Sequence, residues 1–361
     1  MSAAARPPEG GAPLPRGGCR ASRQEGSPAT AAARPPEGGA IPQATEPGAV
    51  RLKAKELGPL TVRTDAPAAR RAIGHLGAVA AAAAALWVVL DSWWALPLTV
   101  LLGYCLAFLF NMEHETAHQT AFRTRAWNYI LGHLAGFAIL LPYEYYRAYH
   151  WEHHRHTQDP ARDPELSVPL PSTRPGLLWT WSGMPILIGR LRLLYAHGVR
   201  GTVTVPWVAP GKHAMIVREA RTYLAGYGFI LAGSIAAGSS MAVWLWLVPL
   251  LVGQLFLRPY LLAEHTGCAH SPNMLENTRT TYANAIVHFF AWNMPFHAEH
   301  HAYPAVPFHA LPRLNRLLAP QIVHTEPGYR VATVTVVRYL LADSRSACRC
   351  ATPAAPDKET A

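Results

Sequence analysis

Eight histidines fall in three five-residue blocks, and each block is rich enough in imidazole to bind a metal. The blocks are His-Glu-Thr-Ala-His at 114–118, His-Trp-Glu-His-His at 150–154 and His-Ala-Glu-His-His at 297–301, called boxes 1, 2 and 3 below. Neutral imidazole is the commonest protein metal ligand, and eight in one place exceed the needs of a single ion. Because long apolar segments flank or separate the boxes, the sequence indicates two transition-metal ions held by nitrogen ligands at a membrane surface.

Helical spacing allows each box to present its imidazoles on one face. Box 1 has histidines at i and i+4, and boxes 2 and 3 have them at i, i+3 and i+4, which are same-face positions on a helix. The predicted ligands are therefore His114, His118, His150, His153, His154, His297, His300 and His301. A further histidine, His156, lies six positions after His150 and points off the shared face, so we predict that it is not a ligand.

Several residues outside this set could complete or orient it. His265 lies just beyond the last long apolar segment and is a candidate ninth ligand by position, while Asn293 could hydrogen-bond a ligand or hold a metal-bound water. Four carboxylates either hydrogen-bond the imidazoles or are ordinary loop residues: Asp159, Asp163, Glu165 and Glu264. The glutamates within the boxes project away from the imidazoles and either orient the rings or face solvent: Glu115, Glu152 and Glu299.

The ligand type does not by itself choose the metal, since imidazole suits iron, copper, nickel and zinc. Zinc sites usually take four ligands, often with cysteine, and catalytic zinc keeps three protein ligands. Eight or nine histidines without nearby thiolates therefore favour two ions. The cysteines are too scattered for a disulfide framework or a four-thiolate zinc site, and they fit a reducing compartment: Cys19, Cys105, Cys268, Cys348 and Cys350.

Four segments are apolar and long enough to span a bilayer, which takes about 20 residues. They cover residues 72–90, 93–112, 222–238 and 241–257, and short breaks at 91–92 and 239–240 make them two helical hairpins. Neither hairpin tip contains Lys or Arg, whereas arginines flank the other ends of all four segments. The positive-inside rule then places both termini and all three boxes in the cytoplasm. Two interrupted apolar stretches, 127–141 and 176–194, are expected to be helices that lie in the interface or pack on the domain.

The N-terminal part differs in composition from the rest of the chain. Residues 1–70 are rich in Ala, Pro, Gly, Arg and Glu, and one decapeptide occurs at both 3–12 and 31–40. Such a composition predicts disorder. The net charge of +10 comes with no basic, aromatic-interleaved surface, so we expect no nucleic-acid partner. The expected organisation is a disordered region at 1–70, one membrane domain at 71–343 and a disordered tail at 344–361.

The boxes and their flanks resemble those of the integral-membrane fatty acid desaturase and hydroxylase superfamily. That superfamily has a His-x(3–4)-His motif followed by two His-x(2–3)-His-His motifs. The resemblance extends to the Thr and Asp-Pro elements after box 2, within residues 147–165, and to residues 292–312 around box 3. It covers roughly residues 70–340.

The resemblance implies a non-haem centre of two Fe ions, dioxygen as co-substrate, and a new double bond in a fatty acyl chain. From the apolar segments and the positions of the boxes we predict an all-α integral membrane fold, with four transmembrane helices in two hairpins and a cytosolic histidine-rich helical cap. The three residues between the box 1 histidines resemble acyl-lipid desaturases and ketolases more than acyl-CoA desaturases. We find no fused haem motif, dinucleotide fingerprint or ferredoxin-type cysteine cluster, so the electrons should come from a separate ferredoxin or small cytochrome with its reductase.

Two alternatives remain open from the sequence. The same centre could hydroxylate or ketolate a lipid or a small molecule, because the outcome depends on how the substrate is placed. A membrane metal transporter or metal-binding protein is the rival of a different class. Its histidines should lie within the spans and line a path across the bilayer, whereas here they lie just outside the spans on one side.

Overall fold

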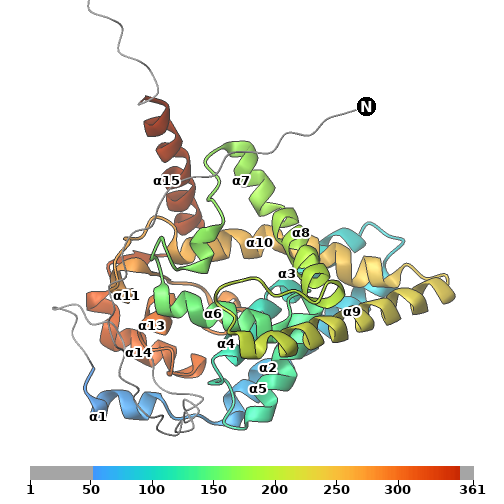
Figure 1. Cartoon of the computed structure of the whole chain (residues 1–361), viewed down its shortest axis with the longest axis horizontal. Coiled ribbons are helices and arrows are strands. Elements are labelled where there is room, and N and C mark those ends of the chain that lie inside the picture. The colour runs from blue at the N-terminus through green and yellow to red at the C-terminus, as the bar shows by residue number, and fades with distance from the viewer. Residues whose placement is uncertain (1–51, 350–361) are drawn as a thin grey trace, which may run out of the picture. The chain divides into compact units, whose positions relative to one another are not determined.

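The computed structural model describes residues 52–349, with side chains up to residue 342. It is almost entirely helical, as expected. The first half of the chain contains α1 (Ala54–Leu57), η1 (Gly58–Leu60), α2 (Asp65–Val88), α3 (Ala95–Ala107), α4 (Leu109–Ala117), α5 (Arg125–Ala138), α6 (Tyr143–His156), η2 (Pro164–Ser167), α7 (Arg174–Trp181) and α8 (Met184–Leu194). Figure 1 shows their arrangement around α6.

The second half continues with helices and two very short strands. It contains η3 (Tyr195–Val199), η4 (Pro210–Lys212), α9 (His213–Ala236), η5 (Val243–Leu247), α10 (Val248–His265), α11 (Met274–Asn277), β1 (Arg279–Thr281), α12 (Ala285–Phe290), α13 (His297–Ala302), η6 (Phe308–Ala310), α14 (Leu311–Leu318), η7 (Ala319–Gln321), β2 (His324–Glu326) and α15 (Tyr329–Arg349). The strands pair in parallel, with Arg279 opposite His324.

Three helices of the described chain are long and apolar enough to cross a bilayer: Asp65–Val88, Ala95–Ala117 and Val243–His265. They overlap three of the four expected spans. The expected span at 222–238 falls on α9, which is not among them. The first part of α9 carries Arg218, Glu219 and Arg221, so its apolar part from 222 to 236 is only about 22 Å long. A hydrocarbon core is about 30 Å thick, and the fourth span is therefore not confirmed.

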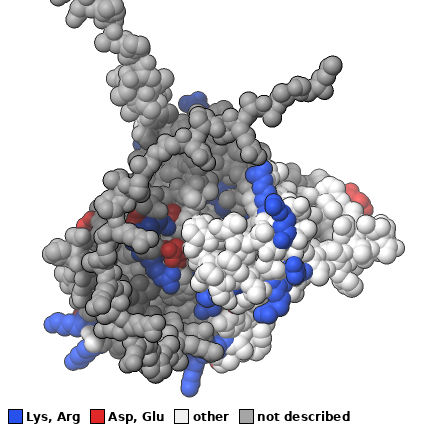
Figure 2. All heavy atoms as spheres, in the orientation of Figure 1, with Lys and Arg blue, Asp and Glu red and all other residues white. Residues whose placement is uncertain are grey.

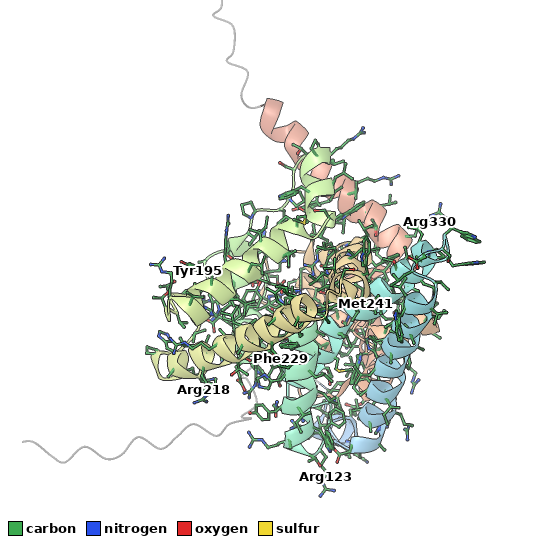
Figure 3. The ribbon with its side chains drawn as sticks, turned by 90° about the vertical axis from the view of Figure 1, so that its right-hand side faces the viewer. Arg123, Tyr195, Arg218, Phe229, Met241 and Arg330 are labelled. Atoms are coloured by element: carbon green, nitrogen blue, oxygen red, sulfur yellow. The ribbon has the colours of Figure 1, made fainter. Side chains whose placement is uncertain are left out.

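The expected second hairpin is likewise not confirmed as a pair of spans. Helix α10 packs mainly on α3, and α9 packs on α6, α8 and η3. A ring contact between Tyr227 and Trp246 joins α9 to η5. Figure 3 shows Arg218 and Phe229 along α9, with Tyr195 of η3 on the same side.

Helical structure lies at both expected domain boundaries. The predicted disordered region reached residue 70, but α2 already begins at Asp65, and Leu60 before it is buried in the main core. Helix α15 runs past residue 343 to Arg349. The decapeptide repeat, the rest of the predicted N-terminal region and the end of the predicted tail lie outside the described residues.

The two central spans cross at a pair of glycines that fix the position of the boxes. A Cβ at Gly253 would lie only 2.0 Å from the Gly103 carbonyl oxygen, and a Cβ at Gly103 would lie 2.4 Å from the Pro249 carbonyl oxygen. Small residues allow such close approach of membrane helices. From this crossing each helix continues about 17 Å to a histidine, His114 on α4 and His265 on α10, so the two chain segments deliver both residues to the same end.

We expect Gly253→Leu to destabilise the protein by about 3 kcal/mol or more, because the added side chain meets backbone that cannot move aside. Thermal unfolding in detergent, followed by size-exclusion chromatography, measures the effect. The matched control is Gly77→Leu on α2, where an added Cβ meets nothing within 4 Å. Equal melting temperatures for the two variants would show that the glycine crossing does not support the fold.

Candidate metal centre

The boxes are carried by different elements that meet in the interior. Box 1 lies at the end of α4, box 2 fills the last turns of α6, and box 3 begins α13; Figure 1 shows α4, α6 and α13 close together. All eight box histidines are at most 4% exposed, and His265 at the end of α10 is 7% exposed. One face of each helix therefore turns its imidazoles inward, as the spacing predicted.

Five of these imidazoles form one group, whose ligand atoms all lie within 4.8 Å of one another: His114, His118, His150, His154 and His300. Their Nε2 atoms converge. The His118–His150 pair is 2.7 Å apart, the His114–His300 pair 2.9 Å and the His150–His154 pair 3.0 Å. The Nδ1 atoms of His118, His154 and His300 have no hydrogen-bond partner in the described chain.

A second group lies beside the first and consists of His153, His265 and His301. His297 adjoins it, since its Nε2 is 3.1 Å from the Nε2 of His265. The imidazoles of His154 and His301 stack at 4.0 Å between ring centroids and so connect the two groups. Sequence position predicts His265 as a ninth member, and the structure brings it together with the boxes.

Hydrogen bonds on the Nδ1 side aim the rings of the second group. The Nδ1 of His153 is 2.9 Å from a carboxylate oxygen of Asp163, and the Nδ1 of His301 is 3.1 Å from the Thr157 hydroxyl. The Nδ1 of His265 is 3.3 Å from the Asn277 carbonyl oxygen. In metalloproteins, partners of this kind fix the tautomer and orientation of a ligating imidazole, leaving Nε2 free for the metal.

The donor set fits metal ions. Two nitrogens bound at 2.0–2.1 Å to one ion lie about 2.9–3.4 Å apart, and the observed Nε2 pairs cover 2.7–3.3 Å. Imidazoles packed this closely cannot all satisfy one another by hydrogen bonds, because each neutral ring has one donor and one acceptor. A cation at each focus would satisfy these buried nitrogens.

The electrostatics keep most of the rings in the neutral form that binds metal. Burial and the neighbouring imidazoles hold the pKa values of His118, His150 and His154 well below their usual range, and burial lowers the pKa of His300 to about 3. His153 is the exception: burial lowers its pKa, but Glu165 and Asp163 outweigh burial and raise it.

Strained backbone follows or precedes each box. Gln119 directly after box 1 and Gln158 shortly after box 2 have positive φ values of 58° and 63°, and Trp292 and Asn293 before box 3 have 51° and 60°. Such conformations cost a residue other than glycine about 1–3 kcal/mol, and they concentrate at functional sites. Gln119 is held there by hydrogen bonds from its Nε2 to the Thr116 carbonyl and the Tyr143 hydroxyl.

Of the residues expected to orient the imidazoles, some lie beside a histidine ring and others bind elsewhere. Glu264 lies 3.5 Å from the Nδ1 of His297, and Glu165 lies 3.8 Å from the Nε2 of His153. Asp159 instead binds Arg162 at 2.7 Å, and Asn293 donates to the Phe308 carbonyl. Within the described chain, neither Asp159 nor Asn293 contacts a box imidazole.

The glutamates within the boxes do not orient the imidazoles. Glu115 accepts hydrogen bonds from Thr120 and from the backbone N–H of Phe308, so it ties box 1 to the segment after box 3. Glu299 accepts from Thr280 and Asn315. Glu152 pairs with Arg155 and with His156, which lies outside both groups as expected.

Two anchoring residues were not found from the sequence. Glu219 on α9 accepts hydrogen bonds from the backbone N–H groups of Glu144 and Tyr145, which open the helix of box 2. Arg279 donates to the carbonyls of Ala263 and Thr266, which flank His265. Glu219 lies 75 residues from Glu144, and Arg279 lies 13–16 residues from the carbonyls that it binds. No local spacing pattern marks either side chain.

Comparison with known proteins identifies the class. The profile of the fatty acid desaturase family matches residues 91–333, which include all three boxes and His265. This chain therefore belongs to the fatty acid desaturase family, an oxidoreductase family, and the resemblance seen in the boxes is confirmed.

Among its relatives, the chain is similar to dihydrorhizobitoxine desaturase of Bradyrhizobium elkanii, with 31% identity over 69% of this chain and 73% of that protein. Similarity to the sphingolipid delta(4)-desaturase of Drosophila melanogaster reaches 25% identity over 71% of this chain and 77% of the relative. The sn-1 oleoyl-lipid 12-desaturase of a Picosynechococcus species is 28% identical over 53% of this chain and 55% of that protein.

Proposed function

We propose that the protein is an oxygen-dependent membrane desaturase that inserts a double bond into a fatty acyl chain at a histidine-ligated di-iron centre. The observation that carries this proposal is the pair of adjacent buried imidazole groups with converging Nε2 atoms. Nine imidazoles are enough for two ions, with five in one group and four in the other. No thiolate belongs to either group in the described chain, which disfavours the common structural zinc sites.

When bound, two iron ions would supply redox chemistry with dioxygen, which redox-inert zinc cannot. The chain's own residues would hold and orient the centre. Asp163, Thr157 and the Asn277 carbonyl fix the rings of His153, His301 and His265. Burial of all nine histidines excludes bulk water from the reacting atoms.

An apolar cavity beside one of the spans supports the proposal of an apolar substrate. A cavity of about 230 Å³ lies between α8, the end of α5 and the η5–α10 helix, and most of its lining is aliphatic. That volume is below the usual range for a whole drug-sized ligand, so it would take part of a longer molecule. The names of the relatives point to different substrates. Within this class of enzyme, the alternative is that the same centre forms a hydroxylated or ketolated product.

Product analysis tests the reaction. The purified protein, supplied with dioxygen, a reducing system and a bilayer lipid mixture, should yield lipids lighter by two hydrogens in mass spectrometry. Products heavier by one oxygen atom would instead establish a hydroxylase. Release of metal across a vesicle membrane without any oxidised product would support the transporter alternative.

The required electrons would enter from a separate donor protein, and we propose Trp151 as the side chain beside which that donor docks. Trp151 is half-buried, and its ring lies 5.0 Å from the His118 ring and 6.2 Å from the His154 ring. Arg147 and Arg155 lie four residues before and after it, on the same helix face. Each of these arginines pairs with a glutamate of the same helix. The docking contact that we propose for a ferredoxin or small cytochrome is therefore the aromatic ring, which contacts two candidate ligands.

We expect Trp151→Leu to slow reduction of the metal centre by a donor protein severalfold while leaving the metal content unchanged. Stopped-flow absorbance with the protein donor measures the rate, and a small chemical reductant serves as reference because it needs no docking site. The control is Trp207→Leu, since Trp207 contacts Tyr149 rather than a box imidazole. Unchanged reduction of the Trp151 variant by the protein donor would exclude this entry point.

A further inference from the structure

The chain from residue 166 to residue 218 contains no aspartate or glutamate. It contains six basic residues, of which Arg190 is buried beside the apolar cavity. The other five are exposed: Arg174, Arg192, Arg200, Lys212 and Arg218. With no acidic side chain of its own to offset them, this segment presents a locally unbalanced positive charge.

The same segment exposes large apolar side chains between its basic residues. Five of them are 52–66% exposed: Leu178, Trp179, Leu191, Tyr195 and Val199. Leu191 and Tyr195 are four residues apart and share a helix face, with Arg192 next to them. Aromatic and aliphatic side chains mixed with arginine are typical of helices that lie in the interface of a membrane.

Its place in the fold puts this segment beside a membrane-spanning helix. Helix α8 shares the lining of the cavity with Leu247, Leu250 and Gln254 of the span Val243–His265. Helices α7 and α8 are themselves too short to cross a bilayer. Figure 2 shows a row of Lys and Arg side chains in blue within a white, uncharged surface. Lipid head groups could meet such a row of charges.

We propose that residues 166–218 rest on the membrane leaflet and bind anionic lipid head groups. The arginines would contact phosphate groups while Trp179, Leu191 and Tyr195 enter the acyl region. An acidic protein would match the charge but not the exposed apolar side chains, so the membrane is favoured. The proposal is independent of the desaturase chemistry and of any bound metal.

Native mass spectrometry of the full chain in detergent, titrated with phosphatidylglycerol or phosphatidylcholine, tests the proposal. The wild-type protein should prefer phosphatidylglycerol, and the preference should weaken as salt screens the charges. Each cation near a membrane surface contributes roughly a fivefold preference. A triple variant should therefore show a preference for phosphatidylglycerol about 100-fold weaker than the wild-type protein does. Its substitutions are Arg174→Gln, Arg192→Gln and Arg200→Gln.

The matched control replaces three exposed arginines elsewhere, Arg123→Gln, Arg313→Gln and Arg316→Gln, and should keep the preference. Equal binding of both lipids by the wild-type protein would overturn the proposal. An unchanged preference for phosphatidylglycerol in the first variant would also overturn it. If that variant instead lost only its affinity for an acidic redox protein, the segment would bind a protein and the proposal would again be overturned. Melting temperatures close to wild type would show that both variants are folded.

Discussion

His300→Ala is expected to lower desaturation by about a thousandfold or more, the scale seen when one member of a group that acts as a unit is removed. His300 is fully buried, and its Nε2 is 2.9 Å from that of His114 and 3.1 Å from that of His118. Its loss would take a central nitrogen out of the five-imidazole group and leave a void in its place. We therefore also expect less bound iron per chain, measured by inductively coupled plasma mass spectrometry.

The control for this experiment is His156→Ala, which removes an imidazole from the helix of box 2. His156 pairs with Glu152 and belongs to neither group, so iron and activity should remain. Full iron content and activity in the His300 variant would contradict the assignment of the five-imidazole group as a ligand set.

Asp163→Asn is expected to reduce metal affinity and activity about 10- to 100-fold, the usual cost of losing a hydrogen-bond partner of a ligating histidine. The Asp163 carboxylate lies 2.9 Å from the Nδ1 of His153, and it accepts hydrogen bonds from the backbone N–H groups of Gln158 and Glu165. An asparagine of the same shape offers one acceptor oxygen in place of two and carries no charge. The ring of His153 would lose its fixed orientation.

Asp159→Asn provides a matched control four residues away in the same loop. The carboxylate of Asp159 is bound by Arg162 at the surface, so its loss should change neither iron binding nor activity. Apparent iron affinity from a chelator competition distinguishes the two variants, and the melting temperature shows whether each is folded. Equal iron affinities for both variants would mean that Asp163 does not position His153.

The imidazole groups could be predicted from the sequence because their geometry is local. Spacings of three and four residues place side chains on one helix face whatever the rest of the fold does, and all three boxes turned out to lie on helices. His265 could be predicted only from its position after an apolar segment. The structure now gives it contacts with His153 and His297.

The remaining contacts depend on packing between distant parts of the chain. Nothing in the spacing indicates that Asp163 rather than Asp159 would reach an imidazole, since the backbone turn at Gln158 decides this. The role of Glu115 likewise depends on the segment at Phe308, nearly two hundred residues away. The expected span at 222–238 is not confirmed, because α9 ends at Ala236 and its first part carries charged residues.

Metal content and oxygen consumption, measured on one preparation of the purified full chain, test the central proposal most directly. We predict about two iron ions per chain and oxygen consumption that requires an electron donor, together with formation of an unsaturated lipid. A protein that binds only zinc or no metal, or that consumes no oxygen when its iron sites are filled and a donor is present, would contradict the proposal.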